Sequence, residues 1–463
     1  MNVTTSMLVL AISASAITPA TLFAAPLTTS IEKTEQQQEQ EQLAQLITVA
    51  IKSDANMAQI NAQQHAMLET SLGSNSLPDP KLKLGIGGLP TDSFSINKDP
   101  MTTLSIGLMQ QFDRGNTLDL QQQKGDIQAN AIGIQQAVRE LDITNKMTQL
   151  WLELGYQQSV YRVLQRNHRL VTELANFTST NYAIGSGEAQ DLLQVKLQVV
   201  KIEDKLQTNL QTQHRIMAQL SEWLGADWLT NKTIIQASNQ LSWQQLNQLM
   251  PRLTATTQHY SLLKQHPMVQ IANSAISANE TQVSIAQQAY KPQFGIEVMY
   301  ASRQANGMSG KPASDLVSAY ITMDLPLFTN NRQDHHYAAA QYQVGAAKSQ
   351  RDLLLNQMNA KVNALLVEHD NLNQRLSRYT DSLLSQAKAR TQAVERGYQN
   401  NTAQFNNVIA AATDELALVI EQARVITDLN ITNSNLAALI NGFDIQPFSL
   451  QFQQSTTINN HNQ

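Results

Sequence analysis

The chain has 463 residues and a formal net charge of −5, so no basic field favours nucleic acid as a partner. It contains no Cys, which excludes disulfides, thiolate metal sites, Cys nucleophiles and a lipidated N-terminal Cys. Aromatic residues make up only 5% of the chain, which is low for a large globular core and is typical of long helices with a narrow apolar seam.

The chain starts with a hydrophobic segment. Residues 7–25 are apolar and rich in small side chains, which predicts a secretory signal peptide over 1–25. Residues 1–6 carry no Lys or Arg, so an uncleaved anchor helix is the alternative. No later segment is apolar enough for a transmembrane helix, so any part of the mature protein inside a membrane is expected to consist of strands.

Residues 26–245 are expected to form a first repeat. A helical pattern runs from Leu43 to about Leu72 and ends at a break over 73–80. Alternating and then heptad-like apolar patterns predict two strands followed by two long helices, at about 81–88, 102–112, 116–180 and 188–225.

The first long helix is informative because of its length. No Pro occurs from Asn116 to Ser179, and a helix of that length would extend about 95 Å. Its apolar residues recur in alternating steps of four and three, with Gln157 in the one polar slot, which predicts left-handed coiled-coil pairing. His168 falls on this seam, and we expect it to be a packed core residue.

Residues 246–445 are expected to form a second repeat in the same order. His266-Pro267 opens a helix that runs to Tyr290. Two strands and two long helices follow, at about 293–302, 316–328, 332–397 and 404–441. Residues 446–463 are expected to be a polar C-terminal tail.

The two repeats keep one register. Phe112 corresponds to Phe328 and Tyr182 to Tyr398, since 328−112 and 398−182 both equal 216. No net insertion therefore separates these parts of the copies. A duplicated unit of strands and very long helices is typical of a mechanical protein more than of a catalyst.

The strands have one apolar face and one polar face. This alternation over 8 to 12 residues is typical of a transmembrane β-barrel, but it fits a soluble four-stranded sheet covered by helices equally well. A closed barrel usually needs about eight strands or more, and open sheet edges are not tolerated in lipid. If the strands span a membrane, several chains must therefore share one barrel.

This arrangement resembles the TolC family of outer-membrane efflux channels over essentially the whole mature chain. The resemblance rests on the duplication, on the strand pair in each half, on His266-Pro267 and on the Tyr-x-x-Gly element at 182–185. It implies a mainly α fold with a transmembrane β-barrel: a homotrimer with one twelve-stranded barrel in outer-membrane lipid, continued by an α-helical periplasmic tunnel. It also implies two partners, a periplasmic adaptor (membrane fusion) protein and an inner-membrane pump.

The first strand pair carries a narrower resemblance, to the branch that serves heavy-metal pumps of the resistance-nodulation-division class. It rests on four segments, Leu77-Pro78-Asp79-Pro80, Leu89-Pro90-Thr91-Asp92-Ser93-Phe94, Asp99-Pro100-Met101-Thr102 and Gln111-Phe112-Asp113-Arg114-Gly115. That branch often has Pro where this chain has Asp113. The resemblance implies heavy-metal cations as the exported substrate.

The sequence carries no catalytic constellation and implies no cofactor. It lacks a phosphate-binding Gly loop, a Gly-x-Ser-x-Gly elbow and a His-Glu-x-x-His motif. His335 and His336 point about 100° apart on a helix, so we interpret them as solvated residues and predict no metal site. The protein is therefore not expected to be an enzyme.

The resemblance implies a gate at the helix turns far from the strands. In the family, a Tyr at the second turn contacts an Asp at the first turn, and these positions are Tyr398 and Asp191. An Arg that adds a link in the family is Ala403 here, and two pore carboxylates are Asn407 and Ala410. Further candidates near the turns are Tyr182, Glu188 and Asp414.

The sequence therefore predicts a passive exit duct of a tripartite efflux system. Within the same family, a multidrug or type I secretion duct is the alternative. A soluble periplasmic coiled-coil adaptor or scaffold is the alternative from another class, although an adaptor would need a β-rich lipoyl-like segment beside a single hairpin.

Overall fold

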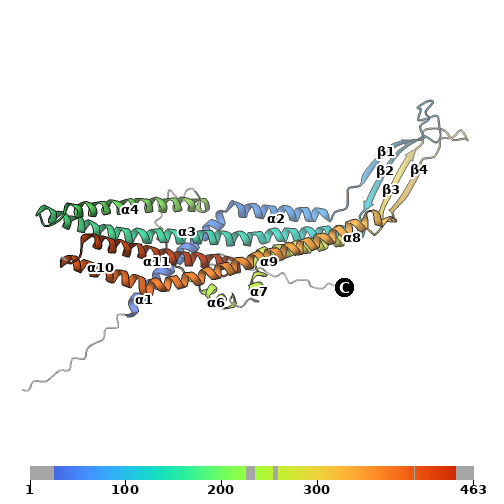
Figure 1. The fold of residues 1–463 in the computed structure, drawn as a ribbon. Helices are drawn as coiled ribbons and strands as arrows, with labels where there is room; N and C mark the ends of the chain where they lie inside the picture. Colours follow the sequence, from blue (N-terminus) through green and yellow to red (C-terminus); the bar gives the residue numbers. More distant parts are fainter. Residues whose placement is uncertain (1–24, 226–234, 254–258, 401, 445–463) are drawn as a thin grey trace, which may run out of the picture.

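The computed structural model describes residues 25–225, 235–253, 259–400 and 402–444. The molecule is elongated, with long helices side by side, a small sheet at one end and two helix turns at the other (Figure 1). The predicted signal peptide over 1–25, except for its last residue, and the predicted tail over 446–463 lie outside the described residues. Among the helices that the structure describes, none is long and apolar enough to cross a membrane.

Within the described residues, the first copy of the repeat contains four helices and two strands. They are α1 (Ala25–Ser53), α2 (Ala55–Ser74), β1 (Lys81–Gly87), β2 (Thr103–Phe112), α3 (Thr117–Ala183) and α4 (Ala189–Leu224). In Figure 1, α4 lies along the turn half of α3 and α2 along its sheet half.

The second copy repeats this plan with more interruptions. Its elements are α6 (Gln244–Leu253), α7 (His259–Leu263), α8 (Pro267–Gln288), β3 (Gln293–Ser302), β4 (Leu316–Asp324), η1 (Thr329–Asn331), α9 (Gln333–Arg378), η2 (Tyr379–Leu383), α10 (Leu384–Gln399) and α11 (Phe405–Ile440). The short helices α6 and α7 were not expected from the sequence. η2 is a π turn that joins α9 to α10, so the expected helix over 332–397 is interrupted once.

The long helices of the two copies begin and end at corresponding residues. The differences 333−117, 399−183, 405−189 and 440−224 all equal 216. The strands are offset by less, since 293−81 equals 212. The register predicted from Phe112 and Phe328 therefore holds for the long helices that follow the strands and not for the strands themselves.

The prediction of a strand over 316–328 is wrong at its end, because β4 stops at Asp324. Pro326 lies two residues later and has no N–H to donate to a strand neighbour. Residues 325–332 then connect β4 to α9, whereas only 113–116 connect β2 to α3. This longer connection accounts for the four-residue difference in offset.

The helix predicted over Leu43 to Leu72 is two helices. It already begins at Ala25, and it breaks at Asp54 between α1 and α2. The Asp54 carboxylate accepts the backbone N–H of Asn56, which caps α2, and it also accepts from Arg139 Nε at 2.6 Å. The Arg139 guanidinium lowers the pKa of Asp54 and holds this carboxylate in its charged, capping form.

The four strands form one antiparallel sheet in the order β1-β2-β3-β4. Leu82, Leu108, Val298 and Ala319 pair across the strands and so share a face, and the next row on that face is Leu84, Ile106, Tyr300 and Val317. The opposite face carries Lys83, Gly107, Met299 and Ser318 in one row, with an ion pair of 3.0 Å between Lys83 Nζ and Glu297 Oε1. The sheet therefore has an apolar face and a polar face.

The apolar face is exposed within one chain. Leu84 is 70% exposed and Ile321 79%, and every residue of β1 is exposed. β1 and β4 each pair with a strand on one side only, so the sheet has two open edges. Such a sheet, apolar on one face and open at both edges, is incomplete as a single chain in water.

Candidate gate at the helix turns

The turn between α3 and α4 is tight. Gly185 adopts a φ of +74°, a conformation that L side chains rarely adopt, and its N–H donates to the carbonyl of Tyr182. The N–H of Ser186 donates to the carbonyl of Asn181 at 2.9 Å. These bonds satisfy carbonyl groups at the end of α3 and reverse the chain within a few residues.

The turn between α10 and α11 occupies the corresponding position of the second copy. The N–H groups of Thr402 and Ala403 both donate to the carbonyl of Gly397, at 2.7 and 3.1 Å. Asn401, which corresponds to Gly185, lies outside the described residues. The two turns lie at the same end of the molecule (Figure 1), and the hairpins pack on each other there through Val195 of α4 and Phe405 of α11.

Tyr398 lies in the last turn of α10, where its ring meets the ring of Phe405 edge-on with centroids 5.5 Å apart. The pair packs on an apolar cluster that joins three helices: Val171 of α3, Val195 and Ile202 of α4, and Phe405 and Ile409 of α11. Burial raises the pKa of the Tyr398 hydroxyl, and the negative charge of Asp191 nearby raises it further. The fold therefore brings Tyr398 close to Asp191.

Asp191 lies in the first turn of α4, which begins at Ala189. Burial raises the pKa of its carboxyl above the usual range, and the neighbouring charge of Glu188 raises it further. Within one chain, the structure shows no hydrogen bond between the described residues Asp191 and Tyr398. The Asp191 carboxylate thus lies near the Tyr398 hydroxyl without a bond to it, in a site that disfavours the charge of the carboxylate.

The other gate candidates lie at the same end but stand apart from this pair. Tyr182 is 49% exposed, and Glu188 and Asn407 are exposed too. Asp414, an alternative source of an acidic ring, pairs with Arg390 at 2.7 Å. An Asp414 carboxylate held in this way does not present a free charge.

His168 is not the packed core residue expected from its place on the seam. Its Nε2 lies 3.1 Å from Glu203 Oε1 of α4, and its side chain is 29% exposed. The seam position therefore lies at the rim of the α3–α4 pair, where a polar group reaches water and a carboxylate.

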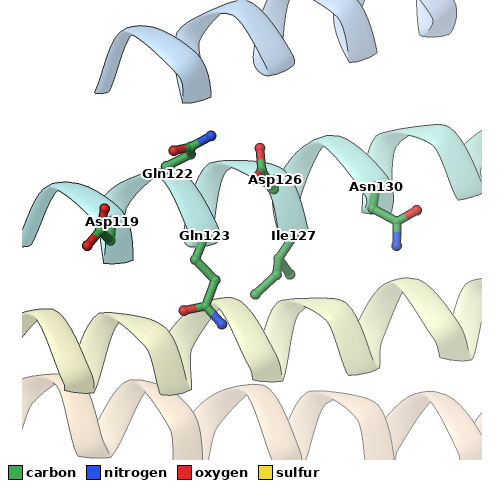
Figure 2. A pocket seen from close by; sticks show the side chains of 6 residues that line it. All are labelled: Asp119, Gln122, Gln123, Asp126, Ile127 and Asn130. Atoms are coloured by element: carbon green, nitrogen blue, oxygen red, sulfur yellow. The ribbon is translucent and has the colours of Figure 1, made fainter. Parts of the chain in front are cut away.

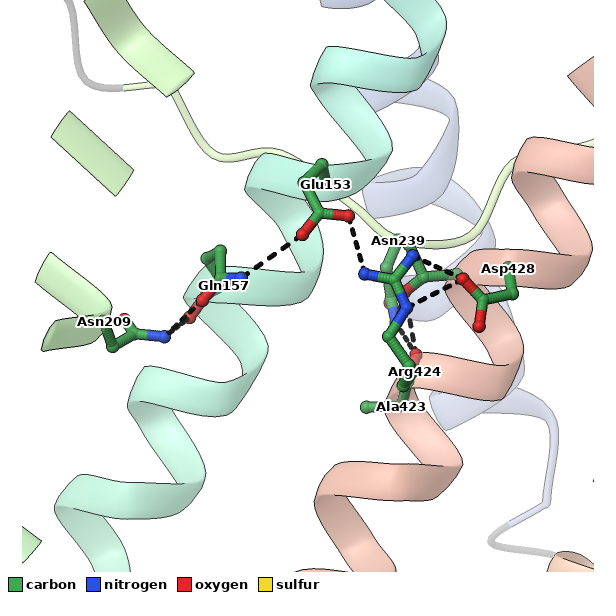
Figure 3. Close-up of polar contacts among 8 residues, drawn as sticks. Glu153, Gln157, Asn209, Asn239, Ala423, Arg424 and Asp428 are labelled. Atoms are coloured by element: carbon green, nitrogen blue, oxygen red, sulfur yellow. Dashed lines mark hydrogen bonds and ion pairs between the residues drawn. The ribbon is translucent and has the colours of Figure 1, made fainter. Parts of the chain in front are cut away.

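A chain of polar contacts crosses three helices at mid-length (Figure 3). Asn209 Nδ2 donates to Gln157 Oε1 at 2.7 Å, and Gln157 Nε2 donates to Glu153 Oε1 at 3.3 Å. Arg424 of α11 then donates to Glu153 Oε2 at 2.7 Å and to Asp428 Oδ1 at 2.5 Å. This chain fixes α4, α3 and α11 at one height. In the sequence, this chain of contacts was indicated by Gln157, the polar residue on the apolar seam of α3.

An extended segment ties α3 to α11 at the same height. Gln158 of α3 accepts the N–H of Ala237 and donates to the carbonyl of Ile235. Asn239 Nδ2 donates to the carbonyl of Ala423, and Trp243 Nε1 donates to Asn430 Oδ1 at 2.7 Å. We call residues 235–243 the strap. No pattern in the sequence predicted it.

The hollow shown in Figure 2 lies on α3 between α2 and α8 and measures about 450 Å³. Its walls are Asp119, Gln122, Gln123, Asp126, Ile127 and Asn130. Asp126 accepts from the Ser71 hydroxyl at 2.6 Å and Gln122 accepts from Asn75 at 2.6 Å, so these groups hold α2 on α3. Within the described residues, no group of three His, Asp or Glu side chains is placed to hold a metal ion.

The fold defined by these elements is that of outer-membrane channel proteins. The chain is similar to the outer membrane protein VceC of Vibrio cholerae, with a TM-score of 0.70, 16% identity, and coverage of 88% of this chain and 98% of that one. It is similar to a membrane protein of Pseudomonas aeruginosa, with a TM-score of 0.70, 14% identity, and coverage of 86% and 90%. It is similar to CusC, with a TM-score of 0.68, 14% identity, and coverage of 87% and 92%.

The predicted fold class is confirmed in its coarse form, a mostly helical chain with a small antiparallel sheet that matches the channel fold. No protein-family model matches the sequence, and no curated protein matches it. The structural neighbours are channel proteins and not enzymes.

Proposed function

We propose that this protein is the outer-membrane channel of a tripartite efflux system. The observation that carries the proposal is the sheet, which exposes an apolar face and leaves both edges unpaired in a single chain. Lipid covers an apolar face, and strands of further copies satisfy open edges. The fold shared with outer-membrane channels supports the same assignment.

The assembly we propose is a homotrimer. Three copies of a four-stranded sheet give a twelve-stranded barrel in outer-membrane lipid, with β1 of one chain beside β4 of the next. The long helices continue the barrel into the periplasm as a tunnel. An exposed apolar stripe on α4, formed by Leu193, Leu197 and Val200, supports this arrangement, because it offers a seam to a helix of a neighbouring chain.

In this assembly, Tyr398 and Asp191 form a latch at the periplasmic end. A Tyr hydroxyl bonded to a carboxylate contributes about 1.5–3 kcal/mol where it is shielded from water. Glu188, Tyr182 and Asn407 line the same end, and Glu188 adds a negative charge to it. A periplasmic adaptor releases the latch, and an inner-membrane pump of the resistance-nodulation-division class drives export through the open duct.

We propose heavy-metal cations as the cargo, on the basis of the four segments around the first strand pair. A strain that lacks the gene should become sensitive to copper, silver, zinc or cobalt, and a plasmid copy should restore resistance. Sensitivity to several drugs and to none of these metals would contradict the cargo and favour the multidrug alternative, while leaving the channel assignment intact.

Fractionation of cells separates the channel from the soluble scaffold. The channel should be found in the outer membrane as an oligomer that heating dissociates. A monomer in the periplasmic fraction would refute the proposal. Leu108→Arg provides a sharper test, because Leu108 is 55% exposed on the apolar face, and an Arg in the middle of a lipid-facing strand costs about 2–4 kcal/mol. Ser105→Arg on the polar face of the same strand is its control.

A further inference from the structure

One histidine of the second copy bonds to the ends of two helices. His266 precedes α8, and its Nδ1 accepts the backbone N–H of Met268 at 3.2 Å, which caps the N-terminus of that helix. Its Nε2 lies 3.3 Å from the carbonyl of Ala438, in the last turn of α11. Carbonyl groups at the end of a helix have no partner inside the helix, so this bond satisfies one of them.

The two partners fix the protonation state of this imidazole. The N–H of Met268 can only donate, so Nδ1 of His266 must be without a proton. The carbonyl of Ala438 can only accept, so Nε2 must carry one. Both bonds therefore exist together only in the neutral form. Protonation of Nδ1 would turn the cap acceptor into a second donor, facing the N–H of Met268.

The surroundings of His266 disfavour a charge on its ring. The residue is 6% exposed, and its neighbours in the chain, Leu263 and Val269, belong to a large apolar cluster. Burial lowers the pKa of His266 below its ordinary value of about 6.5, and the bond to the carbonyl of Ala438 offsets this only in part. The fold therefore holds the ring in its neutral form.

Few charges lie on the elements that pack in this cluster. α8 carries none before Glu280, and α11 carries none after Asp428. No hydrogen bond or ion pair joins His266 to a charged side chain within the described residues. The other charged or imidazole groups on these elements and the segments beside them are Glu140, Asp142, Arg252, His259, Lys264, Lys361 and Asp444.

The first copy divides the same two bonds between two residues. α2 corresponds to α8, since 267−55 equals 212, the offset of the strands, so Asp54 occupies the position of His266. The Asp54 carboxylate caps α2. The hydroxyl of Ser53, which also bonds within α1, donates to the carbonyl of Trp223 in the last turn of α4 at 3.1 Å. A hydroxyl and an ionised carboxylate do not titrate near neutral pH.

The residue beside each cap differs in the same sense. Arg139 of α3 keeps Asp54 ionised, and its counterpart in α9 is Leu355, since 355−139 equals 216. Leu355 is buried in the apolar cluster. A charge pair therefore stabilises the cap of α2, whereas the cap of α8 requires an uncharged ring.

We propose that His266 forms a proton-sensitive contact between α8 and α11: mild acidification breaks it, while the corresponding contact of the first copy persists. Because folding favours the neutral ring, the stability that His266 contributes is present above its ordinary pKa of about 6.5 and is lost as the pH falls through the folded pKa. Asp54 loses its contribution only as the pH falls below its ordinary pKa of 3.8. Between these limits, only the contact at His266 should break. This contact does not depend on the proposed function.

Hydrogen exchange of the full-length protein in detergent tests the proposal, with protection factors that correct for the effect of pH on intrinsic exchange. From about pH 7.5 to about pH 5, the protection factor of the peptide spanning 264–272 should fall about fivefold, the effect expected for loss of one helix N-cap. The peptide spanning 53–60, at the start of α2, should keep its protection. No change in 264–272, or an equal fall in both peptides, would overturn the proposal.

Two variants assign the effect to one ring. His266→Asn keeps a good N-cap residue but does not titrate, so its protection at 264–272 should not depend on pH. His259→Gln removes the other buried imidazole, that of α7, and should keep the fall. The opposite pattern, a fall that persists in His266→Asn or disappears in His259→Gln, would refute the role of His266. If His266→Asn does not fold, the two wild-type peptides and His259→Gln still decide.

Discussion

The two copies of the repeat share helix boundaries but differ in how they are held together. In the first copy, α3 is continuous and pairs with α4 through buried Asn209 and its bonds to Gln157. In the second copy, Val425 occupies the position of Asn209, since 425−216 is 209, and a π turn interrupts the long helix nearby. The first copy therefore has a polar layer that fixes its register, and the second has an apolar layer beside the π turn.

This difference shows how two helix pairs of equal length can differ in the residues that join them. A buried polar residue in a coiled-coil seam specifies register at some cost in stability, whereas an apolar one permits adjustment. We infer that the register of the first hairpin is fixed more strongly than that of the second.

Among the tests that compare the two copies, the largest change in the free energy of unfolding is expected at Gly155, where the strap crosses α3. A Cβ at this position would lie 2.2 Å from the carbonyl carbon of Ser238, and backbone cannot yield as a side chain does. We expect Gly155→Ala to lower the free energy of unfolding by about 3 kcal/mol through overpacking. The corresponding residue Asn371 is exposed, so Asn371→Ala should be neutral in the same urea titration. Equal losses of unfolding free energy in Gly155→Ala and Asn371→Ala would show that contact with the strap does not make the first copy more sensitive than the second.

Exchanging the two seam residues should give the next largest effect. Val425 is 1% exposed and packs with Leu372 and Tyr379, so Val425→Asn buries an amide without a partner and should cost about 2 kcal/mol. Asn209→Val should change the free energy of unfolding by less than about 1 kcal/mol, because apolar seam residues often replace buried polar ones without loss. A larger loss from Asn209→Val than from Val425→Asn would reverse our account of the two seams.

The smallest expected effect is a pH dependence at the tip. The pKa of Asp191 is raised in the folded protein, so folding favours its protonated form. The stability of this turn should therefore rise as the pH falls through that pKa, and it should decline as the pH increases again. The hydrogen-exchange protection factor of the peptide spanning 183–195, which corrects for the slower intrinsic exchange at acid pH, should increase on acidification in the wild type and not in Asp191→Asn. A protection factor that responds to pH equally in both proteins would assign the effect to another group.

Much of the helical framework could be predicted from the sequence, because the heptad seam and the absence of Pro specify long helices locally. The ends of the strands were harder to predict from the sequence. The alternating pattern continues past Asp324, but β4 stops there, two residues before Pro326. The break at Asp54 depends on Arg139, a residue distant in the sequence, and no local pattern reports it.

The resemblance to the channel family predicted that Tyr398 and Asp191 lie together. The fold places them near each other. The prediction could not show that Asp414 is paired with Arg390 or that His168 meets Glu203, because both pairings depend on the rotation of neighbouring helices. The π turn could not be predicted either, because nothing in its residues, Tyr379–Leu383, distinguishes a π turn from an α-helical turn.

Single-channel conductance tests the central claim most directly, with the two Tyr residues that share the offset of 216 as a matched pair. Tyr398 is packed at the tip near Asp191, whereas Tyr182 is 49% exposed. In planar lipid bilayers, we predict a small conductance for the wild type, a clearly larger one for Tyr398→Phe, and no change for Tyr182→Phe. Equal conductance in all three proteins, or an equal increase in both variants, would contradict a gate controlled by the second copy.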